Sequence, residues 1–330
     1  TPGFLSIQPI FPYFLSIKLR KLDKATRFAI KISFKDFYRS QANTYHRLME
    51  SQDAQTKKGG AVLCRLEYEN LYNSLKVSLK NQEDLSIYRC LSAYLFFTND
   101  IEALLDLTNF VCKVAEDFSQ TTLAGNIGFE LGDAFQRRGV IGLRLRDFAL
   151  AESSHLKSID FARNNFSATQ EERQLAIASN YHQLGYIHQL KEDYRKSSEY
   201  YNCALEIQVE YKDFWAQAKV YHHLGTLAYV QGEYDQARKY YQKSLDIKEG
   251  ELNDLQGQAC TLHQFGMLFQ DQGDFEEAER YYQKAIFIKR KFGDTTYVAE
   301  TYGGLGTLYH DLENYEKARE FYQNSLDILI

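Results

Sequence analysis

The stretch Tyr221-His-His-Leu-Gly-Thr-Leu-Ala-Tyr-Val-Gln-Gly-Glu-Tyr-Asp-Gln-Ala-Arg-Lys-Tyr-Tyr-Gln-Lys-Ser-Leu245 decides the fold, because its chemistry recurs in three other blocks of the chain. One glycine marks each copy, and successive marker glycines lie 40, 41 and 40 residues apart. A fixed period of this length is typical of repeat architectures. The marker glycines are Gly185, Gly225, Gly266 and Gly306.

Each copy repeats the same residue types at the same offsets from its marker. An aromatic residue follows at +9, a small residue at +12, an aromatic pair at +15 and +16, and another small residue at +19. Spacings of three and four predict one face of a helix, and the polar break before the +9 aromatic divides the block into two helices. The marker glycine costs the first helix about 1 kcal/mol relative to alanine, which is tolerable where two helices approach closely.

Proline usage supports an all-α reading. The chain has 330 residues and three prolines, all within the first twelve positions. Proline interrupts helix interiors and is common in the turns of β-proteins. Its absence from residues 13–330 therefore favours an almost continuous series of helices.

These motifs resemble the tetratricopeptide repeat. The resemblance rests on Tyr221-His-His-Leu-Gly225 and Tyr302-Gly-Gly-Leu-Gly306, then on Ala237 or Ala318, then on Tyr241 or Tyr322. The usual repeat has about 34 residues and ends in proline, whereas this one is longer and lacks the proline, as in kinesin light chains. The resemblance implies a right-handed α-solenoid of antiparallel helix pairs, each helix longer than usual by about one turn.

A degenerate copy is expected upstream, with Leu131-Gly132 as its marker. This register requires seven extra residues between its two helices, near 140–146, and six more in the loop near 164–172. Residues 86–97 and 101–118 are expected to form another helix pair around the turn Thr98-Asn99-Asp100.

The N-terminal third resembles a junction in STAND-type signalling ATPases, through the run Glu69-Asn70-Leu71 and the apolar segment Gly3–Leu19. The resemblance implies a remnant of a winged helix, followed by a connecting helix over 34–49. We therefore expect a non-repeat N-terminal segment at 1–58, a helical junction at 59–120 and the repeat array at 121–330. It also implies an ATPase module upstream of this chain, which lacks a phosphate-binding GxxxxGK[ST] motif. The chain starts without methionine and is expected to be a piece of a longer protein, with an array that continues past its end.

The net charge and the cysteine pattern indicate which classes of partner and which compartment the sequence favours. The net charge of −5 is too small to indicate a nucleic acid or membrane partner. Residues 1–60 are basic, but the three- and four-residue spacing of their lysines and arginines favours a solvated helix face over nucleic-acid binding. The five cysteines form no CxxC pair, which favours buried thiols in a reducing compartment, the cytoplasm.

The first helix of each pair lines the concave face in this family, so positions −6, −3, −2, +1 and +4 are the candidate peptide-binding residues. Equivalent histidines in neighbouring pairs are expected about 10 Å apart, as packed helices are, which is too far to share a metal. The family's clamp for a C-terminal carboxylate is not expected, because Lys219 is the one cation among these positions and none is Asn. The candidates are His182, Gln183, Tyr186, Gln189, Lys219, His222, His223, Thr226, Tyr229, His263, Gln264, Met267, Gln270, Thr307 and His310.

Two functional hypotheses follow. The first is a non-catalytic scaffold that binds a peptide or partner domain, and the second is the sensor half of a STAND ATPase that transduces a signal to its upstream module. Neither needs a cofactor, and no Ser–His–Asp or Cys–His grouping stands apart from the repeat pattern to suggest an enzyme.

Overall fold

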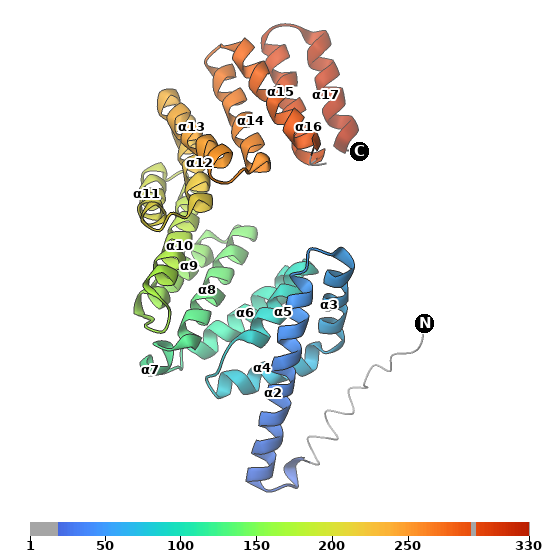
Figure 1. Cartoon of the computed structure of the whole chain (residues 1–330), viewed down its shortest axis with the longest axis vertical. Coiled ribbons are helices and arrows are strands. Elements are labelled where there is room, and N and C mark those ends of the chain that lie inside the picture. The colour runs from blue at the N-terminus through green and yellow to red at the C-terminus, as the bar shows by residue number, and fades with distance from the viewer. Residues whose placement is uncertain (1–18, 292–294, 330) are drawn as a thin grey trace, which may run out of the picture. The chain divides into compact units, whose positions relative to one another are not determined.

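The computed structural model describes residues 19–291 and 295–329, and every regular element in this part of the chain is an α-helix, as the all-α prediction required. The expected winged-helix remnant lies outside the described residues except for Leu19. Two compact units divide the chain, one over 1–173 and the other over 174–330 (Figure 1). The helices are α2 (Lys24–Met49), α3 (Ala54–Leu66), α4 (Tyr68–Lys80), α5 (Ser86–Phe97), α6 (Ile101–Ala115), α7 (Gln120–Leu123), α8 (Asn126–Arg144), α9 (Phe148–Asn164), α10 (Gln170–Leu190), α11 (Tyr194–Glu210), α12 (Phe214–Val230), α13 (Tyr234–Gly250), α14 (Leu255–Asp271), α15 (Phe275–Lys291), α16 (Thr295–Asp311) and α17 (Tyr315–Leu329).

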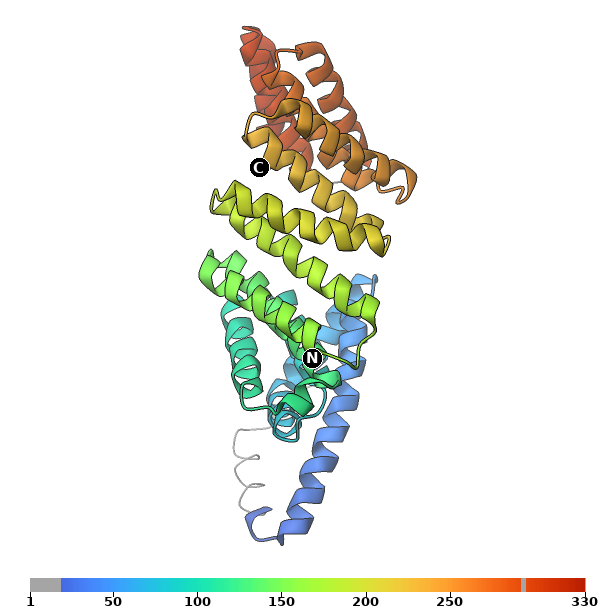
Figure 2. The same ribbon diagram turned by 90° about the vertical axis from the view of Figure 1, so that its left-hand side faces the viewer.

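The predicted helix pairs are present in the second unit. They are α10/α11, α12/α13, α14/α15 and α16/α17, and the two helices of a pair run antiparallel side by side (Figures 1 and 2). Both α12 and α13 have 17 residues, and a three-residue turn joins them. Two such helices and two short turns account for the forty-residue period, so the extra length is helical, as predicted.

The turn inside each pair has one fixed conformation. Seven residues after the marker, the backbone enters the left-handed region, with φ of 76° at Gly232 and 78° at Gly273. Glycine adopts this conformation without the steric cost that Glu192 and Glu313 bear at the same offset. The next residue caps the second helix in α11, where Asp193 Oδ1 accepts from the amide of Lys196 at 3.3 Å, whereas Glu233 makes no such side-chain bond to α13.

The marker glycine is needed because an aromatic ring lies against it. A Cβ atom on Gly225 would lie 2.5 Å from Cδ1 of Tyr241, the buried tyrosine at +16. The equivalent distance is 2.6 Å for Gly185 with Tyr201 and also for Gly266 with Tyr282. The tyrosine ring of the second helix thus occupies the space that a side chain on the first helix would need.

Small residues at +12 and +19 bring the two helices together elsewhere along their length. Ala237 and Ala278 at +12 are fully buried. At +19, Ser244 Oγ donates to the carbonyl of Ala218 at 2.7 Å, which links the second helix to position −7 of the first. The helices of a pair are therefore joined by polar contacts as well as by apolar packing.

The degenerate pair α8/α9 corrects the predicted register. A Cβ on Gly132 would meet its nearest atom at 3.4 Å, an ordinary contact, whereas one on Gly139 would lie 2.4 Å from the buried ring of His155. His155 follows Gly139 by sixteen residues and takes the place of the tyrosine. Ser158 Oγ donates to the carbonyl of Gly132 at 2.8 Å, the same +19 to −7 link as in α12/α13. Gly139 is therefore the marker, and Gly132 lies at −7.

This register removes the seven-residue insertion that was predicted near 140–146. The turn between α8 and α9 has three residues, and Arg146 in its middle has a φ of 57°. The six extra residues predicted near 164–172 do exist, as a longer connection after α9 and an N-terminal extension of α10. The pair Leu131-Gly132 has the same two residues as the Leu–Gly marker of other copies. This likeness is why the sequence indicated the wrong register.

The pair α5/α6 follows the same plan without a marker glycine, as predicted. Asn99, in the middle of its turn, has a φ of 57°, and seven residues earlier the buried Ser92 takes the marker position. Tyr88 Oη of α5 and Thr108 Oγ1 of α6 lie 3.2 Å apart and link the two helices. Thr108 lies at +16 from Ser92. Ser92 and Thr108 are both small and fully buried, which suits a close approach of the two helices.

The N-terminal helices α2, α3 and α4 pack together without the repeat pattern. The predicted connecting helix over 34–49 belongs to the longer α2, and Glu67 separates α3 from α4 within the stretch predicted as a helical junction. Glu67 Oε2 accepts from Tyr38 Oη at 3.0 Å and from Asn70 Nδ2 at 2.7 Å. The run Glu69-Asn70-Leu71 therefore opens α4, next to a polar contact with α2.

The corrected register predicts opposite effects for two glycine substitutions in α8. Gly139→Ala should lower the free energy of unfolding by about 1–3 kcal/mol, because the added methyl group overlaps His155. Gly132→Ala should be neutral or stabilising by up to about 1 kcal/mol, because alanine favours a helix. Urea denaturation followed by circular dichroism measures both, and a larger loss for Gly132→Ala would restore the rejected register.

Candidate functional site

The fifteen predicted binding residues all lie on the first helices α10, α12, α14 and α16, and we call their common surface the first-helix face. Its residues differ in exposure: Lys219, Thr307 and His310 are exposed, while His263 is only 6% exposed and belongs to the packed interior. The others are half-buried, namely His182, Gln183, Tyr186, Gln189, His222, His223, Thr226, Tyr229, Gln264, Met267 and Gln270.

The histidines of this face pack around the buried tyrosines. His182, at −3, lies with its ring centre 5.8 Å from that of Tyr201 in its own pair. His223, at −2 in the next pair, stacks on the same tyrosine at 5.6 Å with the ring planes 13° apart. The two imidazoles lie 5.0 Å apart. Tyr201 thus contacts the −3 residue of its own pair and the −2 residue of the following one.

Other predicted residues bind the hydroxyl ends of these tyrosines. Tyr201 Oη donates to Gln189 Oε1 at 2.9 Å, and Tyr282 Oη donates to Gln270 Oε1 at 3.1 Å, both at position +4. Tyr241 Oη bonds instead to Thr226 Oγ1, at 3.3 Å. Burial raises the pKa of Tyr241 to about 12, so its hydroxyl is a neutral donor at physiological pH.

Contacts along the edge of the face connect successive pairs. Tyr229 Oη donates to Asp271 Oδ2 at 2.6 Å, and Gln270 Nε2 donates to Asp311 Oδ2, also at 2.6 Å. Both bonds run from position +4 of one pair to +5 of the next. Hydrogen bonds therefore connect the face from α12 to α14 and from α14 to α16, and they orient the side chains that make them.

A buried lysine behind the face was not predicted. Lys248 in α13 is 6% exposed, and its Nζ donates to Thr261 Oγ1 at 2.7 Å. His222 Nδ1 lies 3.4 Å from the same hydroxyl. Burial lowers the pKa of Lys248 to about 8. The available signal was the recurrence of a polar residue at +23, where Gln208 and Lys289 are also buried.

Electrostatics keep the imidazoles of the face neutral. Burial lowers the pKa of His182 to about 4 and that of His222 to about 3. The pKa of His223 is well below its ordinary value because of burial and because His182, His222, Lys248 and Lys219 would repel its proton. Neutral rings stack and accept hydrogen bonds, which suits packing and ligand contact. Among the described residues there is no group of three side chains suited to hold a metal ion.

The corrected register reveals matching positions in the first unit that the sequence reading missed. Around Gly139 the positions −6, −3 and −2 hold Asp133, Gln136 and Arg137, and these residues line a hollow of about 260 Å³ together with α5 and α6. At one side of it, Arg89 Nη2 lies 3.3 Å from Glu130 Oε1, and Arg144 lies over the ring of Phe96. The hollow thus combines the first helices α5 and α8 with the second helix α6.

Stacked antiparallel helix pairs whose first helices present a polar face define a helical-repeat protein of the solenoid class. The family model of the tetratricopeptide repeat matches residues 176–250, 216–291 and 257–330. Residues 176–330 therefore consist of tetratricopeptide repeats, as predicted.

Solved structures share this fold at low sequence identity. The chain is similar to BtubC from P. vanneervenii, with 18% identity and a TM-score of 0.57 over 69% of this chain and 90% of that one. It is similar to a Rap protein complexed with the competence and sporulation factor, with 14% identity and a TM-score of 0.58 over 89% and 76%. It is also similar to a STAND protein with a tetratricopeptide-repeat sensor from Pyrococcus horikoshii, with 19% identity and a TM-score of 0.51 over 79% and 40%. No curated protein matches the chain in sequence.

The neutral histidines predict a loss of stability in acid. A histidine whose pKa is lowered by folding stabilises the protein fully above its unfolded pKa of about 6.5, and this stabilisation declines as the pH falls from there toward the folded value. Between pH 7 and pH 5, His223→Gln should lose about 1–2 kcal/mol less of its free energy of unfolding than the wild type. Glutamine is the residue at this position in two other pairs, Gln183 and Gln264.

Denaturation in urea at both pH values measures this difference. His310→Gln is the matched control, because His310 is exposed on α16, and it should keep the wild-type dependence on pH. An unchanged pH dependence in His223→Gln would show that the buried imidazole is not the source.

Proposed function

We propose that the chain is a non-catalytic scaffold that binds a peptide or a partner domain on the first-helix face. The observation that carries the proposal is the row of polar and aromatic side chains along α10, α12, α14 and α16, which hydrogen bonds link from α12 to α14 and from α14 to α16. Such a surface is suited to the main chain and side chains of an extended or helical peptide. The solved structure of the Rap protein with the competence and sporulation factor supports this reading, since a related fold there holds a ligand.

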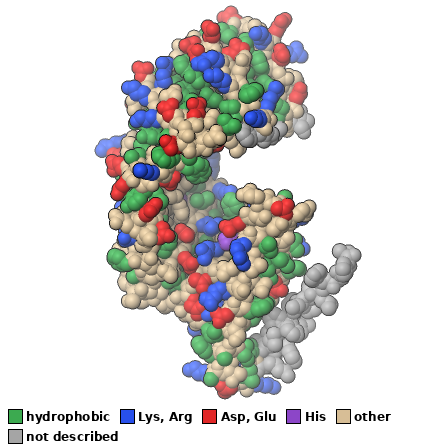
Figure 3. Space-filling model, in the orientation of Figure 1, with side chains coloured by type: hydrophobic (Ala, Val, Ile, Leu, Met, Phe, Trp, Pro, Cys, Tyr) green, Lys and Arg blue, Asp and Glu red, His purple; other side chains and the backbone are tan. Residues whose placement is uncertain are grey.

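The composition of the face sets the chemistry of the ligand. Lys219 is the one cation among the fifteen residues, and its Nζ lies 3.2 Å from the ring centre of the exposed Trp215. The remaining members are amides, hydroxyls, imidazoles, tyrosines and one methionine, so the preferred ligand is a polar and weakly charged peptide. In the view of Figure 3, side chains of both signs are interspersed, which does not favour a polyanion such as nucleic acid.

The proposal also includes the compartment, the cofactor requirement and the signalling role that the sequence predicts. We propose that the protein works in the cytoplasm, needs no cofactor and contributes to signalling through its partner. None of the described helices is both long and apolar enough to cross a membrane.

Site-specific photo-crosslinking tests the proposed binding face. A photoreactive benzoylphenylalanine at position 219, on the first-helix face, should capture the partner from cell extract. The same residue at position 206, where an exposed glutamate lies on α11, should give at least tenfold less product. Tyr186→Ala/Tyr229→Ala should remove the product at position 219. Equal crosslinking from both positions would contradict the assignment of the face.

A second candidate is the sensor half of a STAND ATPase. It is supported by Glu69-Asn70-Leu71 at the start of α4 and by the fold similarity to the Pyrococcus horikoshii protein, of which this chain covers 40%. The coding sequence upstream of Thr1 decides this candidate: a phosphate-binding loop there would support it, and its absence within several hundred codons would exclude it.

A further inference from the structure

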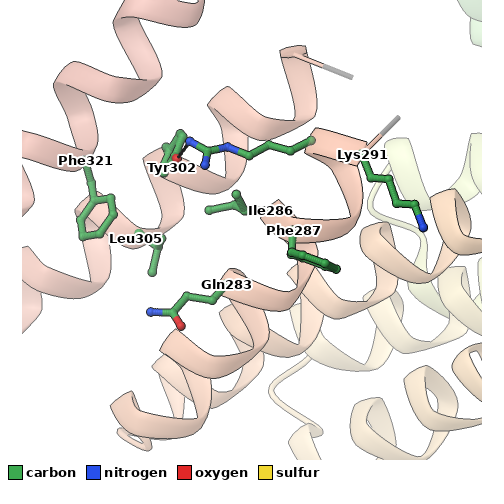
Figure 4. A pocket seen from close by; sticks show the side chains of 8 residues that line it. Gln283, Ile286, Phe287, Lys291, Tyr302, Leu305 and Phe321 are labelled. Carbon is green, nitrogen blue, oxygen red and sulfur yellow. Dashed lines mark hydrogen bonds between the residues drawn. The ribbon is translucent and has the colours of Figure 1, made fainter. Parts of the chain in front are cut away.

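A second surface lies between α15, α16 and α17, away from the first-helix face. A binding role for this surface goes beyond the proposed function. It is a groove of about 600 Å³ with Ile286, Tyr302, Leu305 and Phe321 among its lining residues. Leu305 and Tyr302 are buried, and the ring of Phe321 stacks near Tyr302 at 6.0 Å. Figure 4 shows these side chains beside Phe287 and Lys291 of α15.

The other repeats provide an internal comparison for this groove. Position +21 is a carboxylate in every other pair with a marker glycine, namely Asp160, Glu206, Asp246 and Asp327, but it is Phe287 in α15. Position +24 is Glu249 in the preceding pair, Val209 in the pair before it, and arginine both in α9 and here, as Arg163 and Arg290. Position +25 is Glu210 two pairs earlier and Lys291 here. These positions lie on the second helix of each pair, which packs in the same way with other residues there. The packing of the pair therefore does not require Phe287 in α15.

The exposure of the substituted residues supports the same view. The side chain of Phe287 is 74% exposed, so it contributes little to the packing of α15. Arg290 and Lys291 are exposed, and Arg290 donates to the hydroxyl of Tyr302, a neutral partner. No carboxylate of the described residues pairs with either cation within 4.0 Å. Among the described residues, the groove therefore combines an apolar floor, an exposed aromatic ring and two positive charges without a paired carboxylate.

We propose that this groove binds an acidic peptide segment of a partner protein, with one apolar side chain of the peptide inserted beside Phe287. The apolar side chain would cover the ring and the floor formed by Ile286 and Leu305, and flanking carboxylates would pair with Arg290 and Lys291. Apolar burial supplies most of the affinity in such contacts, and the charges supply orientation and selectivity. Because the net charge of the chain is −5, the positive charge of Arg290 and Lys291 is local and does not follow from a basic overall composition.

Selection from a random dodecapeptide display library on the whole 330-residue chain tests the proposal. Wild-type protein should enrich peptides that carry a leucine or an aromatic residue flanked by aspartate or glutamate. One enriched peptide is then synthesised with a fluorophore, and its dissociation constant is measured by anisotropy. Phe287→Asp/Arg290→Glu, which restores the residues of the preceding pair, should weaken binding at least tenfold. Replacing the acidic residues of the peptide by their amides should do the same.

Two matched variants serve as controls. Lys284→Glu changes an exposed charge on α15 outside the groove lining, and Lys219→Glu changes the first-helix face; both should bind within threefold of the wild type. Failure to enrich acidic peptides, or equal binding by Phe287→Asp/Arg290→Glu, would overturn the proposal. A loss confined to Lys219→Glu would assign the peptide to the first-helix face and also overturn it.

Two other occupants would contradict the proposed one. A concentration-dependent dimer in sedimentation that Phe287→Asp/Arg290→Glu abolishes would show that a second copy of the chain covers the groove. A labelled single-stranded oligonucleotide that binds the wild type and is lost in the same variant would show a polyanion site.

Discussion

The packing of the second unit depends on one contact, the tyrosine ring at +16 against the bare backbone of the marker glycine. Because the ring lies where a Cβ would be, it fixes the distance and the register between the two helices of a pair. The three-residue turn then follows, since the left-handed residue at +7 must reverse the chain within reach of that contact. Interiors are close-packed, so such a contact admits little variation.

The same contact shapes the surface proposed to bind a partner. The ring of Tyr201 contacts the residues at −3 and −2, and the tyrosine hydroxyls bond to residues at +1 or +4. The first-helix face is therefore also the wall that encloses the tyrosines. Its half-buried histidines and glutamines have a structural role as well as a proposed binding role, whereas the exposed Phe287 beside the second groove contributes little to packing.

The sequence predicted the second unit well, because aromatic and small residues recur there at fixed offsets and define both helices of each pair. It failed in α8/α9, where His155 replaces the tyrosine and Leu131-Gly132 imitates the marker. Phe148, Ala151 and Ser158 lie at +9, +12 and +19 from Gly139, and the contact with His155 then showed that Gly139 and not Gly132 is the marker. Offsets could place the candidate residues on one face, but they could not show that His263 is enclosed or that Lys248 lies behind His222. Those facts depend on which side chains the next pair brings against them.

The most direct test of the central contact is a double-mutant cycle between positions 225 and 241. Alone, Gly225→Ala should lower the free energy of unfolding by about 1–3 kcal/mol, whereas Gly303→Ala, where a Cβ would meet nothing within 4 Å, should not. In a Tyr241→Leu background the penalty of Gly225→Ala should fall by about 1 kcal/mol or more, because the overlapping ring is gone. An equal penalty in both backgrounds would contradict the account, because it would show that the glycine is not needed to accommodate the ring.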